Sequence, residues 1–136
     1  MRNREKKEKQ CLNCGNDIPN RNIYCNNKCQ VEYRRLQNYK KIEEGDYSDY
    51  NRMDTIDIAT KRYLIYKNGN KCMKCGWDEV NIHTNKVPIQ LNHIDGDPSN
   101  QNLDNLELLC PNCHSLTEFF GSRGKGREER YKKIIY

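Results

Sequence analysis

The sequence predicts a small α+β fold in two parts, and three observations lead to this fold class. Only 35% of the 136 residues are hydrophobic and the mean hydropathy is −1.14, so the chain cannot bury a large apolar core. Eight cysteines occur as close pairs, which can supply the stability that such a core would otherwise give. Short runs with the period of a strand or of a helix lie between and beside these pairs.

The cysteines are spaced as metal ligands are. The four pairs are Cys11/Cys14, Cys25/Cys29, Cys72/Cys75 and Cys110/Cys113. Such pairs suit tetrahedral zinc, in which four sulfurs lie about 2.3 Å from one ion. Disulfides are the alternative, because an even cysteine count can cross-link a secreted chain. The charged residues 1–10 lack the apolar stretch of a secretory signal, which favours two structural zinc ions and a reducing, cytoplasmic compartment. No segment is long and apolar enough to span a membrane, so no membrane partner is expected.

Residues 1–42 form the first predicted domain, a basic arm followed by a finger with the first four cysteines. The pair Cys25/Cys29 leads directly into a helical pattern, whose apolar stripe is Val31, Tyr33, Leu36 and Tyr39. A knuckle, a hairpin and a helix in this order resemble a treble-clef zinc finger. Arg34 and Arg35 lie outside the stripe and are expected to contact nucleic acid.

A polar linker is predicted at residues 43–53, and the second domain at residues 54–136. A helix is expected to begin near Asp54 and to end at Asn68-Gly69-Asn70. Its apolar stripe is Ile56, Ala59, Tyr63 and Tyr66.

The cysteine pairs of the second domain enclose a predicted hairpin. Val87, Ile89 and Leu91 alternate as in a half-buried strand, and Pro88 favours an edge position. The run Asp95-Gly96-Asp97-Pro98 predicts a turn. Beyond the last pair, a short helix ending at Gly121 is predicted from Leu116, Phe119 and Phe120.

This hairpin region resembles the HNH nuclease family with its ββα-metal fold. The matching segments are Leu91-Asn92-His93-Ile94-Asp95-Gly96-Asp97, Asn105-Leu106, and Leu109-Cys110-Pro111-Asn112-Cys113-His114. The resemblance covers about fifty residues. It implies a metal-dependent endonuclease that hydrolyses phosphodiester bonds of double-stranded DNA, by nicking or by cutting both strands, as in phage and mobile-element enzymes for homing, packaging or defence. It also places the protein in the cytoplasm of a bacterial or phage-infected host cell.

The resemblance implies a role for each motif residue. His93 would be the general base that deprotonates the attacking water. The Asn105 carbonyl would accept from the His93 ring and fix its tautomer. His114 would bind one catalytic divalent ion, Mg²⁺ or Mn²⁺, at the scissile phosphate. Asn92 stands where the family commonly has a metal-binding Asp or His. Its amide oxygen can coordinate the ion but lacks the charge of a carboxylate, so either metal binding is weaker or Asp95 or Asp97 assists.

The charge distribution favours nucleic acid as the binding partner but does not exclude other functions. The net charge is +5, with basic residues concentrated at both ends and on the first helix. Arg123, Lys125 and Arg127 follow the predicted nuclease site and are expected to contact DNA. The main alternative is a non-catalytic, zinc-dependent DNA- or RNA-binding protein, and a second is a zinc scaffold for protein partners. The oligomeric state stays open.

Overall fold

The computed structural model describes residues 8–121 and divides the chain into two compact units after Glu44. The predicted linker at residues 43–53 therefore falls across this division, and its larger part belongs to the second unit. Tyr47 contributes to that unit directly, because its hydroxyl donates to the Gln101 carbonyl at 3.0 Å. No helix in the described part of the chain has the length and apolar character needed to cross a membrane.

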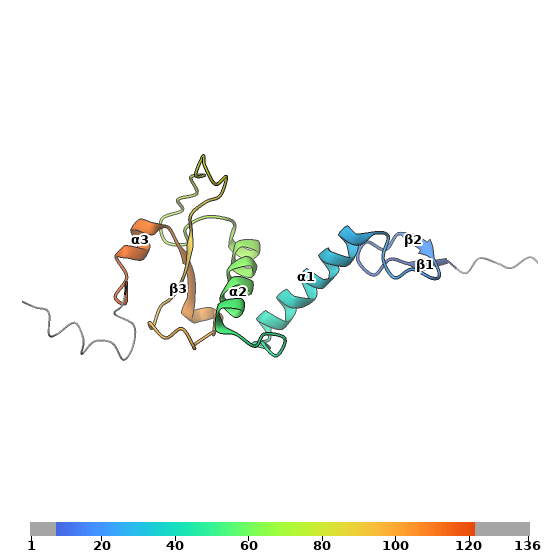
Figure 1. Ribbon diagram of the computed structural model, residues 1–136, viewed down its shortest axis with the longest axis horizontal. Coiled ribbons are helices and arrows are strands. Elements are labelled where there is room, and N and C mark those ends of the chain that lie inside the picture. Colours follow the sequence, from blue (N-terminus) through green and yellow to red (C-terminus); the bar gives the residue numbers. More distant parts are fainter. Residues whose placement is uncertain (1–7, 122–136) are drawn as a thin grey trace, which may run out of the picture. The chain divides into compact units, whose positions relative to one another are not determined.

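The first unit is a two-stranded hairpin followed by a long helix (Figure 1). Strands β1 (Glu8–Gln10) and β2 (Asp17–Pro19) pair antiparallel, with Lys9 opposite Ile18. Helix α1 (Asn27–Glu43) begins before Cys29 rather than after it. The side chain of Asn26 caps the helix by accepting from the Cys29 backbone N–H at 3.0 Å, so the cap also fixes a cysteine.

The second unit places a short hairpin between two helices (Figure 1). Its elements are α2 (Met53–Asn68), β3 (Gln90–His93), the single turn η1 (Leu103–Asn105), β4 (Leu106–Leu109) and α3 (Pro111–Ser115). The predicted helix near Asp54 is confirmed as α2, and it ends at Gly69, whose φ of 84° suits a residue without a Cβ.

The antiparallel register of β3 and β4 gives the hairpin two distinct faces, because paired residues share a face and successive residues alternate. One face, called the α3 face below, carries Gln90, Asn92, Glu107 and Leu109. The other, called the α2 face, carries Leu91, His93, Leu106 and Leu108. The names reflect side-chain contacts: His114 of α3 bonds to Gln90, and Asp57 of α2 lies near His93.

The apolar core of the second unit is small, as the composition predicts. Its fully or nearly buried apolar side chains are Tyr63, Leu64, Ile89, Leu106, Leu108 and Leu109. The cysteines Cys72, Cys110 and Cys113 join Leu109 in one buried cluster, against which Trp77 packs. Most of this cluster therefore consists of potential metal ligands.

Two predicted elements differ from the structure. The strand predicted from Val87 pairs only from Gln90 onward, because Pro88 lacks a backbone N–H for the ladder. The helix predicted to reach Gly121 ends at Ser115 and leaves Leu116 exposed. The hydroxyls of Ser115 and Thr117 donate to carbonyls one turn back, which offers this backbone an alternative to further helix.

Candidate functional site

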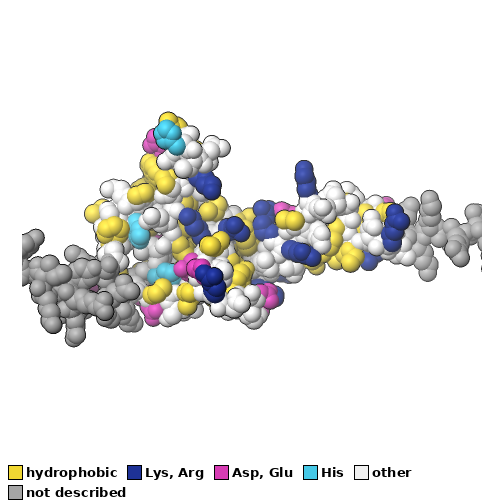
Figure 2. All heavy atoms as spheres, viewed as in Figure 1, with side chains coloured by type: hydrophobic (Ala, Val, Ile, Leu, Met, Phe, Trp, Pro, Cys, Tyr) yellow, Lys and Arg dark blue, Asp and Glu magenta, His cyan; other side chains and the backbone are white. Residues whose placement is uncertain are grey.

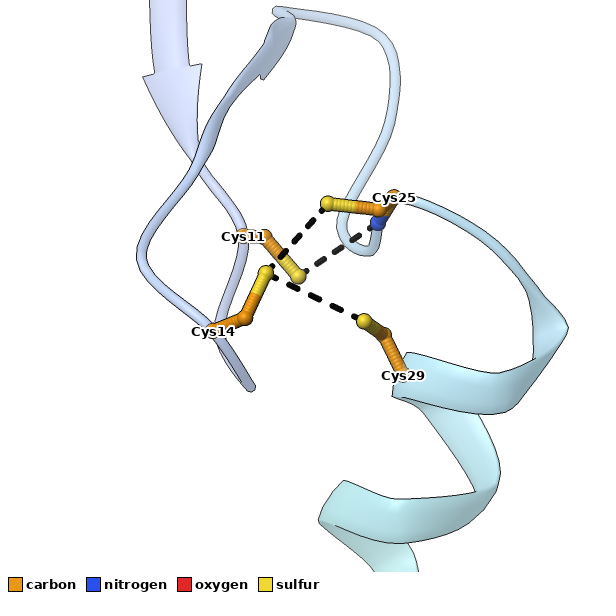
Figure 3. Close-up of side chains that lie close together, drawn as sticks. All are labelled: Cys11, Cys14, Cys25 and Cys29. Atoms are coloured by element: carbon orange, nitrogen blue, oxygen red, sulfur yellow. Dashed lines mark hydrogen bonds between the residues drawn. The ribbon is translucent and has the colours of Figure 1, made fainter.

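Cys11, Cys14, Cys25 and Cys29 converge in the first unit (Figure 3). Their sulfur atoms all lie within 4.8 Å of one another, with Cys14–Cys25 at 3.4 Å and Cys14–Cys29 at 3.9 Å. A tetrahedron with metal–sulfur bonds of about 2.3 Å has sulfur atoms about 3.8 Å apart. All four cysteines are free thiols, so the group is compatible with a zinc site.

Cys72, Cys75, Cys110 and Cys113 form the equivalent group of the second unit, again with all sulfur atoms within 4.8 Å. The knuckle at Cys72 is tied to β4, because the N–H of the next residue, Met73, donates to the Leu108 carbonyl at 2.8 Å. Cys110 caps α3 by accepting from the Cys113 N–H at 3.4 Å. This group therefore joins the knuckle, the hairpin and α3 at one point, as predicted.

Within each four-cysteine group, the pKa values of the thiols shift in opposite directions. Burial alone raises the pKa of Cys11 and of Cys72, but backbone N–H donors outweigh it and lower each pKa to about 6. The hydrogen bond with Cys14 and burial raise the pKa of Cys25 to about 12. Burial and neighbouring cysteines raise the pKa of Cys113 to about 12. Crowded thiolates repel one another, and a bound dication relieves that repulsion.

His114 lies on α3 and its ring is oriented by the hairpin. Nδ1 hydrogen-bonds to Oε1 of Gln90, and because a carbonyl oxygen only accepts, Nδ1 carries the proton. The lone pair of the neutral ring is then on Nε2. A histidine that donates one N–H to a protein carbonyl and keeps the other nitrogen free is the usual form of a metal-binding histidine. Phe120 packs edge-on against the ring, with centroids 5.3 Å apart.

Asn92 lies on the α3 face, the same face as Gln90, and is only 8% exposed. Its Nδ2 donates to Glu107 Oε1 at 2.9 Å, directly across the hairpin. No hydrogen bond to Asn92 Oδ1 is found among residues 8–121. His114 offers an imidazole nitrogen, a ligand type that suits transition metals, and Asn92 offers an amide oxygen, a ligand type that suits Mg²⁺ or Mn²⁺.

His93 ends β3 on the α2 face, where two side chains approach its Nε2 atom. The Gln101 amide nitrogen lies at 3.1 Å and Asp57 Oδ1 lies at 3.8 Å. Because an amide nitrogen only donates, His93 Nε2 accepts and is the unprotonated, basic nitrogen of the ring. The Gln101 amide also donates to Asp57 Oδ1 at 2.8 Å and to the Pro98 carbonyl at 2.9 Å. It also contacts Met53 Sδ at 3.6 Å, so two hydrogens serve four acceptors. Among the three nitrogen and oxygen acceptors, the bond to His93 is the longest and the weakest.

Asn105 does not accept from the His93 ring, contrary to the sequence-based expectation. Its Oδ1 accepts from the Asp95 N–H at 3.0 Å, and its Nδ2 donates to Asp95 Oδ1 at 2.9 Å and to the Asn100 carbonyl at 3.1 Å. Its own carbonyl accepts from the Ile94 N–H at 2.9 Å. Asn105 therefore fixes the loop that directly follows His93, because its carbonyl and both of its side-chain polar atoms bond there.

In the turn after His93, the side chains of Asp95 and Asp97 accept hydrogen bonds from other residues of the same turn. Asp95 Oδ1 accepts from the Asp97 N–H, and Asp95 Oδ2 accepts from Asn100 Nδ2 at 2.7 Å. Asp97 Oδ1 accepts from the N–H and the hydroxyl of Ser99. At Gly96, φ is 70° and an added Cβ would lie 2.5 Å from the Phe119 ring, so only glycine fits there. These bonds make Asp95 and Asp97 turn formers, and the assistance of either residue to the ion stays a prediction.

The predicted nucleic-acid contacts lie partly within the described residues. Figure 2 shows Lys and Arg side chains spaced along α1, with few acidic groups on that face. Arg34 is exposed there, whereas Arg35 forms an exposed ion pair with Glu32 at 2.6 Å. Arg123, Lys125 and Arg127 lie outside the described residues.

Sequence reasoning missed four residues that contact the candidate site: Asp57, Gln90, Gln101 and Glu107. None lies in a motif segment that suggested chemistry. For Glu107 a signal did exist, because a charged residue between Leu106 and Leu108 in a predicted strand projects to one defined face.

Comparison with known proteins gives a partial match to the H-N-H endonuclease F-TflIV of Escherichia phage T5, with 41% identity over 58 residues. The match covers 43% of this chain and 25% of the phage protein, so the chain spans about a quarter of the curated relative that it matches. No family model matches the chain, and no solved structure gives a significant match. The partial match supports an HNH family assignment and nuclease activity in general.

Proposed function

We propose that this protein is a metal-dependent DNA endonuclease in which His93 is the general base and His114 and Asn92 hold one catalytic divalent ion. The observation that carries the proposal is a pair of oriented histidines, His93 on strand β3 of the hairpin and His114 on α3, which is bonded to the hairpin. The ring nitrogen of His93 that accepts protons is fixed on the α2 face, and His114 is fixed against the α3 face. A protein that only binds nucleic acid needs neither arrangement.

An in-line displacement at phosphorus would require both histidines to reach one phosphate at the end of β3. In such a reaction the attacking water and the leaving oxygen lie on opposite sides of the phosphorus atom. His93 would hold and deprotonate the water from one side of the strand end. His114 and Asn92 would face the other side. A divalent ion bound there would stabilise the developing charge on the phosphoryl and leaving oxygens.

Asp57 supports the proton transfer to His93. When Nε2 takes the proton of the water, the ring becomes a cation, and the Asp57 carboxylate 3.8 Å away stabilises that cation. Gln101 must release Nε2 first, which costs little because its amide keeps Asp57 and Pro98 as acceptors. We assign both residues to positioning the base.

The remaining parts of the chain would bind zinc and DNA. Each four-cysteine group would hold one structural zinc ion, and the second would fix the hairpin against α3. Arg34 on α1 and the basic residues Arg123, Lys125 and Arg127 would contact phosphates of double-stranded DNA. The site would act in the cytoplasm of a bacterium or phage-infected cell, as the phage relative suggests.

Two observations favour the alternative of a non-catalytic nucleic-acid-binding protein. The Gln101 amide occupies His93 Nε2, and the position before His93 is a neutral amide instead of a carboxylate. Cleavage of supercoiled plasmid by the zinc-loaded protein with Mn²⁺ separates the two functions. We expect nicked or linear product from wild type and from His83→Ala, whose histidine lies in an exposed loop, and none from His93→Ala. If all three proteins shift DNA in a gel and none cuts it, the binding function replaces the nuclease.

A further inference from the structure

We propose that Glu107 is the carboxylate of the divalent-ion site, where it orients Asn92 through one oxygen and offers the other oxygen and its charge to the ion. This inference rests on the proposed function, because it names a further residue of the same site. It assigns the negative charge of the site to β4, the strand opposite the motif residue Asn92.

The hairpin register brings the two side chains together. Asn92 and Glu107 are direct partners in the antiparallel ladder and share the α3 face. Their side chains meet, with Asn92 Nδ2 donating to Glu107 Oε1 at 2.9 Å. This bond directs the amide nitrogen of Asn92 toward β4, so its carbonyl oxygen must point elsewhere.

The carbonyl oxygen of Asn92 is the second observation. Asn92 is 8% exposed, and no hydrogen bond to Oδ1 is found in the described part of the chain. The buried side-chain atoms without a partner in the described residues are Thr60 Oγ1 and Gln101 Oε1, and they do not include Asn92 Oδ1. Water can therefore reach this oxygen, and a cation that accepts an oxygen lone pair can replace that water.

Charge determines which residue completes the site. A neutral His114 and a neutral Asn92 contribute no charge, whereas Mg²⁺ and Mn²⁺ favour sites with carboxylate ligands. Asp95 is the nearest acid in sequence, but both of its carboxylate oxygens are bonded within the turn. For Glu107, the one hydrogen bond found within residues 8–121 is the bond that Oε1 accepts from Asn92 Nδ2.

The test is Mn²⁺ binding to the full, zinc-saturated chain, measured by electron paramagnetic resonance of free Mn²⁺ without DNA. Glu107→Gln keeps the side-chain shape and removes the charge. We expect its Mn²⁺ affinity to fall about 10- to 100-fold, the loss typical of changes around a metal site. Glu79→Gln is the matched control, because Glu79 is exposed and bonded to no part of the site, and its affinity should equal that of wild type.

Exchanging the charged and neutral side chains between the two positions distinguishes lost Mn²⁺ binding from a folding defect. The double variant Asn92→Asp with Glu107→Gln exchanges carboxylate and amide across the ladder and keeps one donor and one acceptor. We expect it to regain most of the Mn²⁺ affinity that Glu107→Gln loses. If Glu107 were needed only for folding, the double variant would bind Mn²⁺ no better than the single variant, which would overturn the inference.

The remaining outcomes separate this inference from the nuclease proposal. Unchanged Mn²⁺ affinity in Glu107→Gln, or no Mn²⁺ binding by wild type, overturns the role of Glu107. Weakened Mn²⁺ binding in Glu107→Gln together with no plasmid cleavage by wild type supports the ion site and overturns the nuclease instead.

Discussion

The side-chain amide of Gln101 donates to Nε2 of His93 at 3.1 Å, and the same amide bonds to Asp57 at 2.8 Å. This contact identifies Nε2 as the basic nitrogen of the ring and places a carboxylate where an imidazolium would need it. It also means that the proposed base is covered until a substrate or water displaces one amide hydrogen. The chemistry of the site therefore depends on α2 as well as on the hairpin.

Removing the carboxylate next to His93 should slow cleavage without preventing it. In Asp57→Asn the imidazolium loses its partner, and we expect the rate of the chemical step to fall about tenfold, within the range for general-base catalysis. Single-turnover cleavage with Mn²⁺ measures this rate. Asp104→Asn removes an exposed carboxylate from η1 and is the control. A loss of Mn²⁺ binding in Asp57→Asn would contradict the assignment of Asp57 to the base.

Asn105 should matter for the loop rather than for the His93 ring. Asn105→Ala removes three side-chain hydrogen bonds to the loop after His93, and we expect the free energy of unfolding to fall by about 1–3 kcal/mol. Denaturant unfolding of the zinc-loaded protein measures the loss. Cleavage should fall as well, because the loop no longer fixes the end of β3. Full stability combined with lost cleavage would instead indicate direct contact with the base.

The two four-cysteine groups should have separable roles, because they lie in different units. Cys11→Ser should reduce bound zinc from two ions to one, weaken DNA binding and leave Mn²⁺-dependent cleavage at high protein concentration. Cys72→Ser should also leave one zinc ion but abolish cleavage, since this group holds the hairpin against α3. Zinc content by elemental analysis and plasmid cleavage test both variants. Equal cleavage by the two variants would show that the second group does not support the site.

Zinc binding should release protons at neutral pH. Without metal, Cys25 and Cys113 are protonated at pH 7 because their pKa is raised to about 12, whereas Cys11 and Cys72 are largely ionised because their pKa is lowered to about 6. Zinc displaces the remaining protons, so its apparent affinity should rise as the pH increases from about 6.5 to about 8.5. Calorimetry in two buffers of different ionisation enthalpy counts the protons. An affinity independent of pH would mean that the thiols are already ionised.

Local spacing made the metal groups and the motif residues predictable. Cys11 to Cys29 form one group because a tight knuckle and a capped helix start bring them together, and both signals are short-range. His93 and His114 were singled out by short segments that resemble the HNH family, and their roles stay predictions.

Contacts that depend on register or on distant elements were not predictable. Glu107 meets Asn92 only through the pairing of β3 with β4, and a shift of one residue would move it to the other face. Asp57 lies on α2 close to His93, and the apolar stripe of that helix did not predict this contact. The Asn105 contact was wrong because its side chain bonds to the turn, which supplies nearby donors and acceptors.

The most direct test of the central claim is chemical rescue of His93→Ala by imidazole, using the zinc-loaded protein with saturating Mn²⁺. If His93 is the general base, this variant should cleave plasmid far more slowly than wild type, and added imidazole should restore part of the rate. His114→Ala should gain nothing from imidazole under the same conditions. Cleavage by His93→Ala at the wild-type rate would contradict the account, because another group would then activate the water.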